Sequence, residues 1–85
     1  MTCRIDRLST DRGVLLRVSG RIAGEDLEVL RCALEERGVV AVELSEVELV
    51  DRDAVKLLAL NKGNGVELRL CPAYIREWVT RERRS

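Results

Sequence analysis

The sequence predicts a small α/β domain, a mixed β-sheet with helices packed on it in the order β-β-α-β-α-β-α. Short segments in which apolar and polar residues alternate predict strands, and segments with apolar residues three or four apart predict helices. Helical segments separate the later strands, which predicts two β-α-β units with parallel strands and right-handed crossovers. A length of 85 residues suits one domain, and we expect residues 1–85 to form it.

The first two strands are expected to form an antiparallel hairpin. Residues 3–8 alternate between apolar and charged side chains, the period of a half-buried strand. The segment 11–13 reads Asp-Arg-Gly, which favours a turn because glycine readily takes a positive φ. The apolar run at 14–18 predicts the second strand, and we expect Ser19 and Gly20 to end it.

A helix and a central strand are predicted next. From Glu25 to Arg37 apolar residues recur at helical spacing, at Leu27, Leu30, Ala33 and Leu34. Gly38 is placed to end this helix in a left-handed conformation. The run Val39–Leu44 is apolar at nearly every position, which is typical of a strand covered on both faces or lying within a sheet.

The last three predicted elements are a helix, a strand and a helix. Residues 51–60 are largely apolar after the first turn and predict a mostly buried helix, which the Gly-Asn-Gly segment 63–65 stops. Residues 66–70 alternate between apolar and charged side chains and predict a strand. Pro72 suits the first turn of a final helix, whose apolar stripe comprises Ile75, Trp78 and Val79.

The composition argues against several classes of function. Fifteen basic residues balance fifteen acidic ones, so the chain lacks the excess of positive charge with which proteins neutralise nucleic-acid phosphates. No run approaches the roughly 20 apolar residues of a membrane helix, and no basic-then-apolar leader begins the chain. Histidine is absent, which removes Ser-His and Cys-His nucleophiles and most zinc sites. We therefore expect no enzyme, no cofactor and no metal.

The three cysteines are expected to be structural. Cys3, Cys32 and Cys71 are odd in number and widely separated, so they fit neither a disulfide framework nor a metal knuckle. We expect them to act as small buried hydrophobes in a reducing cytosol, which places the protein in the cytoplasm.

Three segments resemble one known family. Residues 43–54 read ELSEVELVDRDA, which is similar to the Asp-Leu-Ser-Gly-Val-x-φ-φ-Asp-Ser-Ser-Gly segment (φ apolar) of STAS domains, the anti-sigma factor antagonist family. Residues 14–22 resemble that family's strand ending in Gly-Arg-Leu/Ile, and residues 65–72 resemble its last strand and the turn into the final helix. The resemblance covers nearly the whole chain and implies a STAS-like fold.

The same resemblance implies a site at the start of the second helix. In the family, a partner kinase phosphorylates the second serine of Asp-Ser-Ser-Gly, and the matching residue here is Asp53. Arg52 and Ala54 replace the neighbouring serine and glycine, and Asp51 alone is retained. The position therefore has no hydroxyl group, and serine phosphorylation cannot regulate it in the usual way.

Two interpretations of Asp53 remain open. In the first, Asp51 caps the helix and Asp53 is a first-turn acid that the helix dipole stabilises by about 0.3–1 kcal/mol. In the second, Asp53 is a fixed mimic of phosphoserine. The mimicry is partial, because a phosphate carries about 1.5–2 negative charges and three acceptor oxygens.

The resemblance implies a non-catalytic protein–protein interaction module in bacterial signalling and regulation of transcription. Its partner would be an anti-sigma factor, a kinase-like protein or another regulatory protein. We expect the partner to bind Asp51, Arg52, Asp53 and Lys56, together with Arg21 in the adjoining loop. The alternative is a nucleotide- or metabolite-binding adaptor of the same fold, although the chain has no GxGxxG or P-loop motif.

Other polar and aromatic residues have simpler interpretations. Ser45 is expected to bond backbone N–H groups in a loop after the central strand, and the acidic run at 43–53 is expected to be a solvated rim. Trp78 is expected to complete the core, with Tyr74 at its edge, and a docking patch is the alternative. The arginines near the C-terminal end, Arg76, Arg81, Arg83 and Arg84, are expected to be solvated, and contact with an acidic partner surface is the alternative.

Overall fold

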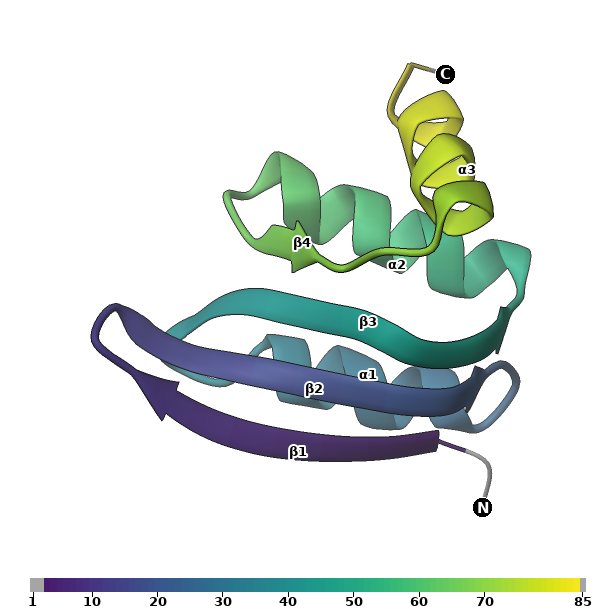
Figure 1. Ribbon diagram of the computed structural model, residues 1–85. Helices are drawn as coiled ribbons and strands as arrows, with labels where there is room; N and C mark the ends of the chain where they lie inside the picture. Colours follow the sequence, from purple (N-terminus) through teal and green to yellow (C-terminus); the bar gives the residue numbers. More distant parts are fainter. Residues whose placement is uncertain (1–2, 85) are drawn as a thin grey trace.

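The strands of this protein form one mixed sheet in which strand order follows chain order. The computed structural model describes residues 3–84. Its elements are β1 (Cys3–Thr10), β2 (Gly13–Ile22), α1 (Asp26–Leu34), β3 (Val39–Val50), α2 (Arg52–Gly63), β4 (Glu67–Arg69) and α3 (Ala73–Arg84). The sheet order is β1-β2-β3-β4, with β1 antiparallel to β2 and the other pairs parallel (Figure 1). The predicted fold class and element order are confirmed.

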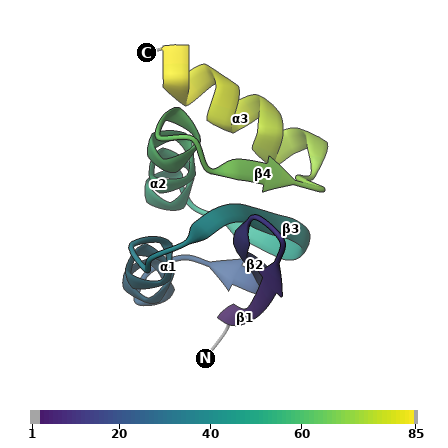
Figure 2. The ribbon, with the colours of Figure 1, turned by 90° about the vertical axis from the view of Figure 1, so that its left-hand side faces the viewer.

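Two helices cover the same face of the sheet. The chain steps from β2 to β3 to β4 in one direction, so two right-handed crossovers place α1 and α2 on one side. Figure 2 shows both helices on that side, with α3 against α2 at the β4 end of the sheet. Within residues 3–84, no helix lies over the opposite face of the sheet, and this helix-free face is turned toward the viewer in Figure 1.

The hydrophobic core lies between the sheet and the helices. Its sheet side comes from alternate residues of β2 and β3, and its helix side from the apolar stripes of α1, α2 and α3. The fully buried large side chains are Leu16, Val18, Ile22, Leu30, Val42, Leu44, Val55, Leu58, Ile75 and Val79. Burying each such side chain contributes about 1.5–3 kcal/mol. Trp78 is partly buried and packs against this cluster, while Tyr74 is exposed and donates a hydrogen bond from its hydroxyl to Glu48 O at 3.1 Å.

The strands of the central pair are longer than the sequence predicts. β2 does not end at Ser19 and Gly20 but continues to Ile22, and β3 continues past Leu44 to Val50. Shifts of register accompany this extension, and Gly20 takes a φ of +88°. Ser19 is polar and of a type common in loops, but it stays in the strand because the parallel pairing of β2 with β3 continues until Ile22 pairs with Val50.

Helix boundaries also differ from the prediction. α1 ends at Leu34, three residues before Arg37, so Gly38 does not end the helix. Gly38 does take a left-handed φ of +83°, but it serves the turn into β3, where its carbonyl accepts a hydrogen bond from Val14 N at 2.6 Å. α2 runs past Leu60 to Gly63, and β4 is confined to Glu67–Arg69.

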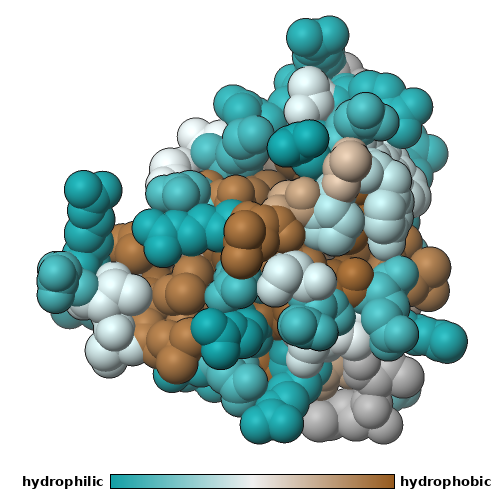
Figure 3. Space-filling view, viewed as in Figure 1, coloured by the Kyte–Doolittle hydropathy of each residue, from teal (hydrophilic) through white to brown (hydrophobic). Residues whose placement is uncertain are grey.

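Charged side chains of alternating sign cross the helix-free face. Asp6, Arg17, Glu43 and Arg69 are successive partners on the four strands. Arg17 Nε donates to Glu43 Oε2 at 3.0 Å, and this hydrogen bond lowers the pKa of Glu43 below its ordinary value. Figure 3 shows this face, on which hydrophilic residues interrupt the apolar surface. Opposite charges on facing positions of neighbouring strands stabilise the pairing.

Ser45 lies within this sheet and not in a loop. It belongs to β3, and its hydroxyl donates to Glu43 Oε1 at 3.2 Å. The prediction that Ser45 bonds backbone N–H groups is therefore wrong. Its strand position follows from the extended pairing of β2 and β3, in which Arg17 faces Glu43 and Ser19 faces Glu46.

Replacing Gly13 by alanine is expected to destabilise the fold by about 1–3 kcal/mol. Gly13 has a φ of +146°, and an added Cβ would lie 2.4 Å from Gly38 O and 2.9 Å from Val40 Cγ1. Gly63→Ala is the matched control, because a Cβ there has no neighbour within 4 Å; it should leave stability equal or higher by up to about 1 kcal/mol. Urea unfolding measures both, and equal effects of the two substitutions would contradict the steric argument.

The Arg17 side chain is expected to control the titration of Glu43. Because the folded-state pKa of Glu43 lies below its unfolded value of about 4.3, the pair stabilises the fold above that pH. This stabilisation is lost as the pH falls through the folded pKa. In Arg17→Ala the pKa of Glu43, followed by NMR of its side-chain carboxyl carbon, should rise. Arg4→Ala is the control, because Arg4 pairs with Asp6, and a Glu43 titration that Arg17→Ala leaves unchanged would refute this assignment.

Candidate functional site

The candidate site lies where two parallel strands end and a helix begins. Ile22 at the end of β2 pairs with Val50 at the end of β3. Asp51 follows directly, and its backbone N–H donates to Ile22 O at 3.2 Å. The carboxyl ends of β2 and β3 are therefore tied together at the point where α2 starts, which holds this end of α2 against the sheet.

Asp51 holds two backbone segments with one carboxylate. Its Oδ1 accepts from Ala54 N at 2.8 Å, the N-cap of α2, and its Oδ2 accepts from Gly24 N at 3.3 Å. Gly24 has a φ of +58° in the loop that follows β2. The cap that the sequence predicts is confirmed, and the bond to Gly24 is an additional contact. Asp51 is thus a positioning residue, and its place in a partner surface stays a prediction.

The residues after Asp51 lie on the surface of the first turns of α2. Asp53 and Lys56 are exposed, and within residues 3–84 neither side chain has a hydrogen bond or an ion pair. Arg52 is 70% exposed, and its Nε lies 4.0 Å from Glu82 Oε1 on α3. The structure therefore brings Arg52, Asp53 and Lys56 together on one end of α2, with charges of both signs.

Arg21 lies at the carboxyl end of β2, next to the start of α2, and not in the adjoining loop where the sequence places it. It is exposed, and it is the residue before Ile22, whose partner Val50 precedes Asp51. Its register partner on β3 is Leu49, which is 47% exposed. We call Arg21, Asp51, Arg52, Asp53 and Lys56 the α2-start surface.

The acidic run from Glu43 to Asp53 does not converge on one point. Glu43 faces Arg17 on the helix-free side of the sheet, while the Asp51 carboxylate is occupied by two backbone N–H groups. Glu46 and Glu48 are exposed on β3. Over residues 3–84, no three acidic or cysteine side chains are grouped so as to hold a metal ion.

The cysteines differ from one another in their surroundings. All three are free thiols: Cys3 is buried, Cys71 is partly buried and Cys32 is exposed. Burial raises the pKa of Cys3 and of Cys71. The prediction of three buried hydrophobes is wrong for Cys32, because Leu30, Ala33 and Leu34 take the face of α1 that packs on the core.

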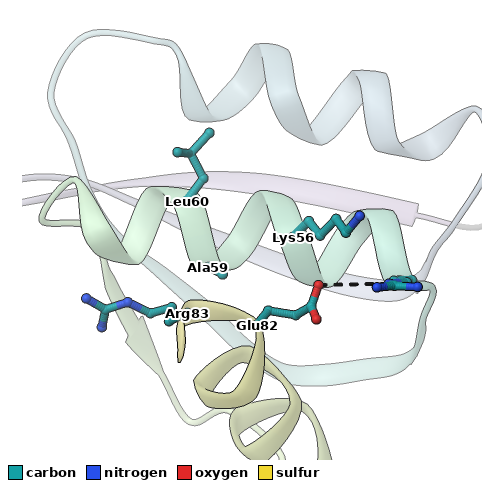
Figure 4. Close-up of a pocket in the computed structure, with 6 residues that line it drawn as sticks. Lys56, Ala59, Leu60, Glu82 and Arg83 are labelled. Carbon is teal, nitrogen blue, oxygen red and sulfur yellow. Dashed lines mark ion pairs between the residues drawn. The ribbon is translucent and has the colours of Figure 1, made fainter. Parts of the chain in front are cut away.

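Sequence reasoning missed a groove between α2 and α3. Figure 4 shows it, with Lys56, Ala59 and Leu60 on α2 and Glu82 and Arg83 on α3, and Arg52 completes the lining. Leu60 is 63% exposed, although the apolar composition of α2 predicts a mostly buried helix. The spacing of Lys56 and Leu60, four residues apart, was the available signal, because such residues lie on one helix face. The position of α3 against that face was not readable from the sequence.

Comparison of the chain with protein-family models and with curated proteins finds no match. In the part of the chain that the structure describes, no helix combines the length and the apolar character needed to cross a bilayer.

Substitutions of Asp51 should separate its two contacts. Asp51→Ala removes both and is expected to destabilise the fold by about 1–2 kcal/mol. Asp51→Asn keeps one acceptor oxygen for the shorter bond to Ala54 N but cannot accept from Gly24 N with its amide nitrogen. Hydrogen exchange should then accelerate at the Gly24 amide and stay slow at Ala54. If the exchange rates of the Gly24 and Ala54 amides in Asp51→Asn equal those in the unaltered protein, this assignment of the two contacts is contradicted.

Proposed function

We propose that this chain is a non-catalytic protein-interaction module that resembles an anti-sigma factor antagonist and binds a regulatory protein through its α2-start surface. The observation that supports it most directly is the state of Asp53, which is exposed and has no side-chain partner within residues 3–84. It lies on a helix start that Asp51 attaches to the neighbouring loop. Exposed charges on such a fixed support are available to a partner without a cost of ordering the backbone.

The charge pattern of this surface favours a protein partner of mixed sign. Arg52 and Lys56 are positive, Asp53 is negative, and all three are exposed. Complementary charges on a partner would set the orientation of binding and speed the encounter more than they raise the affinity. We place this interaction in bacterial cytoplasmic signalling that regulates transcription, where the family resemblance locates it.

The partner interaction would not be switched by a serine kinase at this position. Asp53 has no hydroxyl group to accept a phosphoryl group. A carboxylate in the first turn of α2 is also stabilised by the helix dipole, so the charge serves folding and binding at once.

Removal of the Asp53 charge is expected to weaken partner binding while leaving the fold intact. Proteins captured from the native cytosol by the unaltered chain would be purified, and their affinities would be measured for Asp53→Asn and Asp53→Ser. We expect both variants to bind about 2- to 5-fold more weakly, since one charge–charge contact contributes up to roughly 1 kcal/mol. Asp11→Asn, which removes an exposed acid in the hairpin turn, is the matched control.

Two results of this experiment would count against the proposal. Equal affinities of the unaltered protein, Asp53→Asn and Asp53→Ser would show that Asp53 is only a first-turn acid. Equal losses in Asp11→Asn and Asp53→Asn would show that the partner responds to net charge and not to the α2-start surface.

A further inference from the structure

The groove between α2 and α3 has a volume of about 520 Å³ and a basic lining. Arg52, Lys56 and Arg83 contribute positive charge, and Glu82 is the one acid in the lining. A second hollow shares Arg83 and extends the basic surface to Lys62 and Arg84. We call this continuous surface the α2–α3 groove. It begins at the α2-start surface, with which it shares Arg52 and Lys56, and runs along the contact between the two helices.

Among the cations that line this groove, Arg52 alone has a carboxylate within ion-pair distance in the described part of the chain. On the sheet and α1, ion pairs neutralise Arg4, Arg7, Arg17, Arg31 and Arg69. Around the groove, by contrast, no side-chain ion pair or hydrogen bond within residues 3–84 is made by Lys56, Lys62, Arg83 or Arg84. Arg52 approaches Glu82 only to 4.0 Å, and the Glu82 side chain is just 16% exposed. The accessible charge of the groove is therefore positive, in a chain whose formal net charge is zero.

An apolar side chain accompanies these cations. Leu60 is 63% exposed, lies one helical turn from Lys56 and points away from α3, so it forms the outer rim of the groove, while Ala59 on the side toward α3 is buried. A free phosphate ion would not contact an apolar side chain. A helix with one acidic and one apolar face would contact both the cations and Leu60. Nucleic acid is disfavoured by the balanced net charge of the chain.

We propose that the α2–α3 groove binds an acidic amphipathic segment of a protein partner. In this complex, an apolar side chain of the segment packs on Leu60, and its flanking carboxylates pair with Lys56 and Arg83. The inference rests on the proposed function, because it names the chemistry of a partner segment that continues from the α2-start surface. Unpaired cations attract the acidic segment over several ångströms and set its register on the groove.

The experiment uses a synthetic helical peptide with a leucine stripe flanked by glutamates. Its matched control is a peptide in which glutamine replaces every glutamate. Calorimetric titration should show binding of the acidic peptide that weakens as salt is raised, and no binding of the glutamine peptide. Lys56→Glu with Arg83→Glu should weaken binding about 10-fold or more, since two attractions become repulsions. Leu60→Ser should weaken it several-fold.

Arg12→Glu with Arg37→Glu is the control for net charge. Both arginines are exposed and lie outside the groove, and the double variant changes the net charge by the same amount. It should bind the acidic peptide as the unaltered protein does. Circular dichroism of each variant verifies that the fold is retained.

Four outcomes would overturn the proposal. The first is an equal loss of binding in the groove variant and the control variant, and the second is equal binding of the two peptides. The third is tighter binding of duplex DNA than of the acidic peptide at the same salt. The fourth is self-association of the unaltered protein, detected by sedimentation and abolished both by Lys56→Glu and by Glu46→Lys. That result would show that a second copy of the chain occupies the groove.

The two proposals can fail independently. Asp53→Asn leaves the groove unaltered and should bind the acidic peptide normally, although it weakens the captured partner. If the acidic peptide does not bind but Asp53→Asn weakens the captured partner, only the proposal for the α2–α3 groove is refuted. Suppose instead that Asp53→Asn binds the captured partner with normal affinity and that peptide binding depends on Lys56 and Arg83. These results would refute only the proposal that the α2-start surface binds the partner.

Discussion

The arrangement of this molecule depends on one carboxylate that accepts from two backbone N–H groups. Asp51 joins the first turn of α2, through Ala54 N, to the loop after β2, through Gly24 N. The same residue's backbone N–H bonds to Ile22, so three segments meet at the carboxyl ends of β2 and β3. The direction in which α2 leaves the sheet follows from these bonds. That direction in turn determines which residues of α2 enter the core and which remain on the surface.

Periodicity predicted the fold because burial imposes it. Alternation in β2 and β3 and the helical stripe of α1 are direct consequences of one face being covered, so element type and order could be read from the chain. Boundaries could not, because they depend on partners distant in sequence. Ser19 and Ser45 look like loop residues locally, but continued pairing of β2 with β3 keeps both in strands. α1 ends early because the chain must turn back for Gly38 to meet Val14.

The candidate site was predictable in part for a similar reason. An aspartate before a helix is a strong local signal for an N-cap, and charged residues in the next turns are normally exposed, so Asp51, Arg52 and Asp53 could be placed. The bond to Gly24 and the groove beside α3 depend on tertiary packing. Leu60 illustrates the difficulty: its side chain is apolar like its neighbours, but α3 packs beside it and not over it.

The agreement of strand order with chain order has a consequence for how the last unit of the molecule is held. Each strand pairs with its neighbour in sequence, and the last addition, β4 with α3, is joined to the sheet through only three residue pairs. The attachment of this unit therefore rests less on the strand ladder than on the burial of Ile75 and Val79 of α3 in the core. Release of this unit would disassemble the α2–α3 groove but leave Asp51 and its two bonds in place. The groove thus depends on the core packing of α3, whereas the α2-start surface depends on the hydrogen bonds of Asp51.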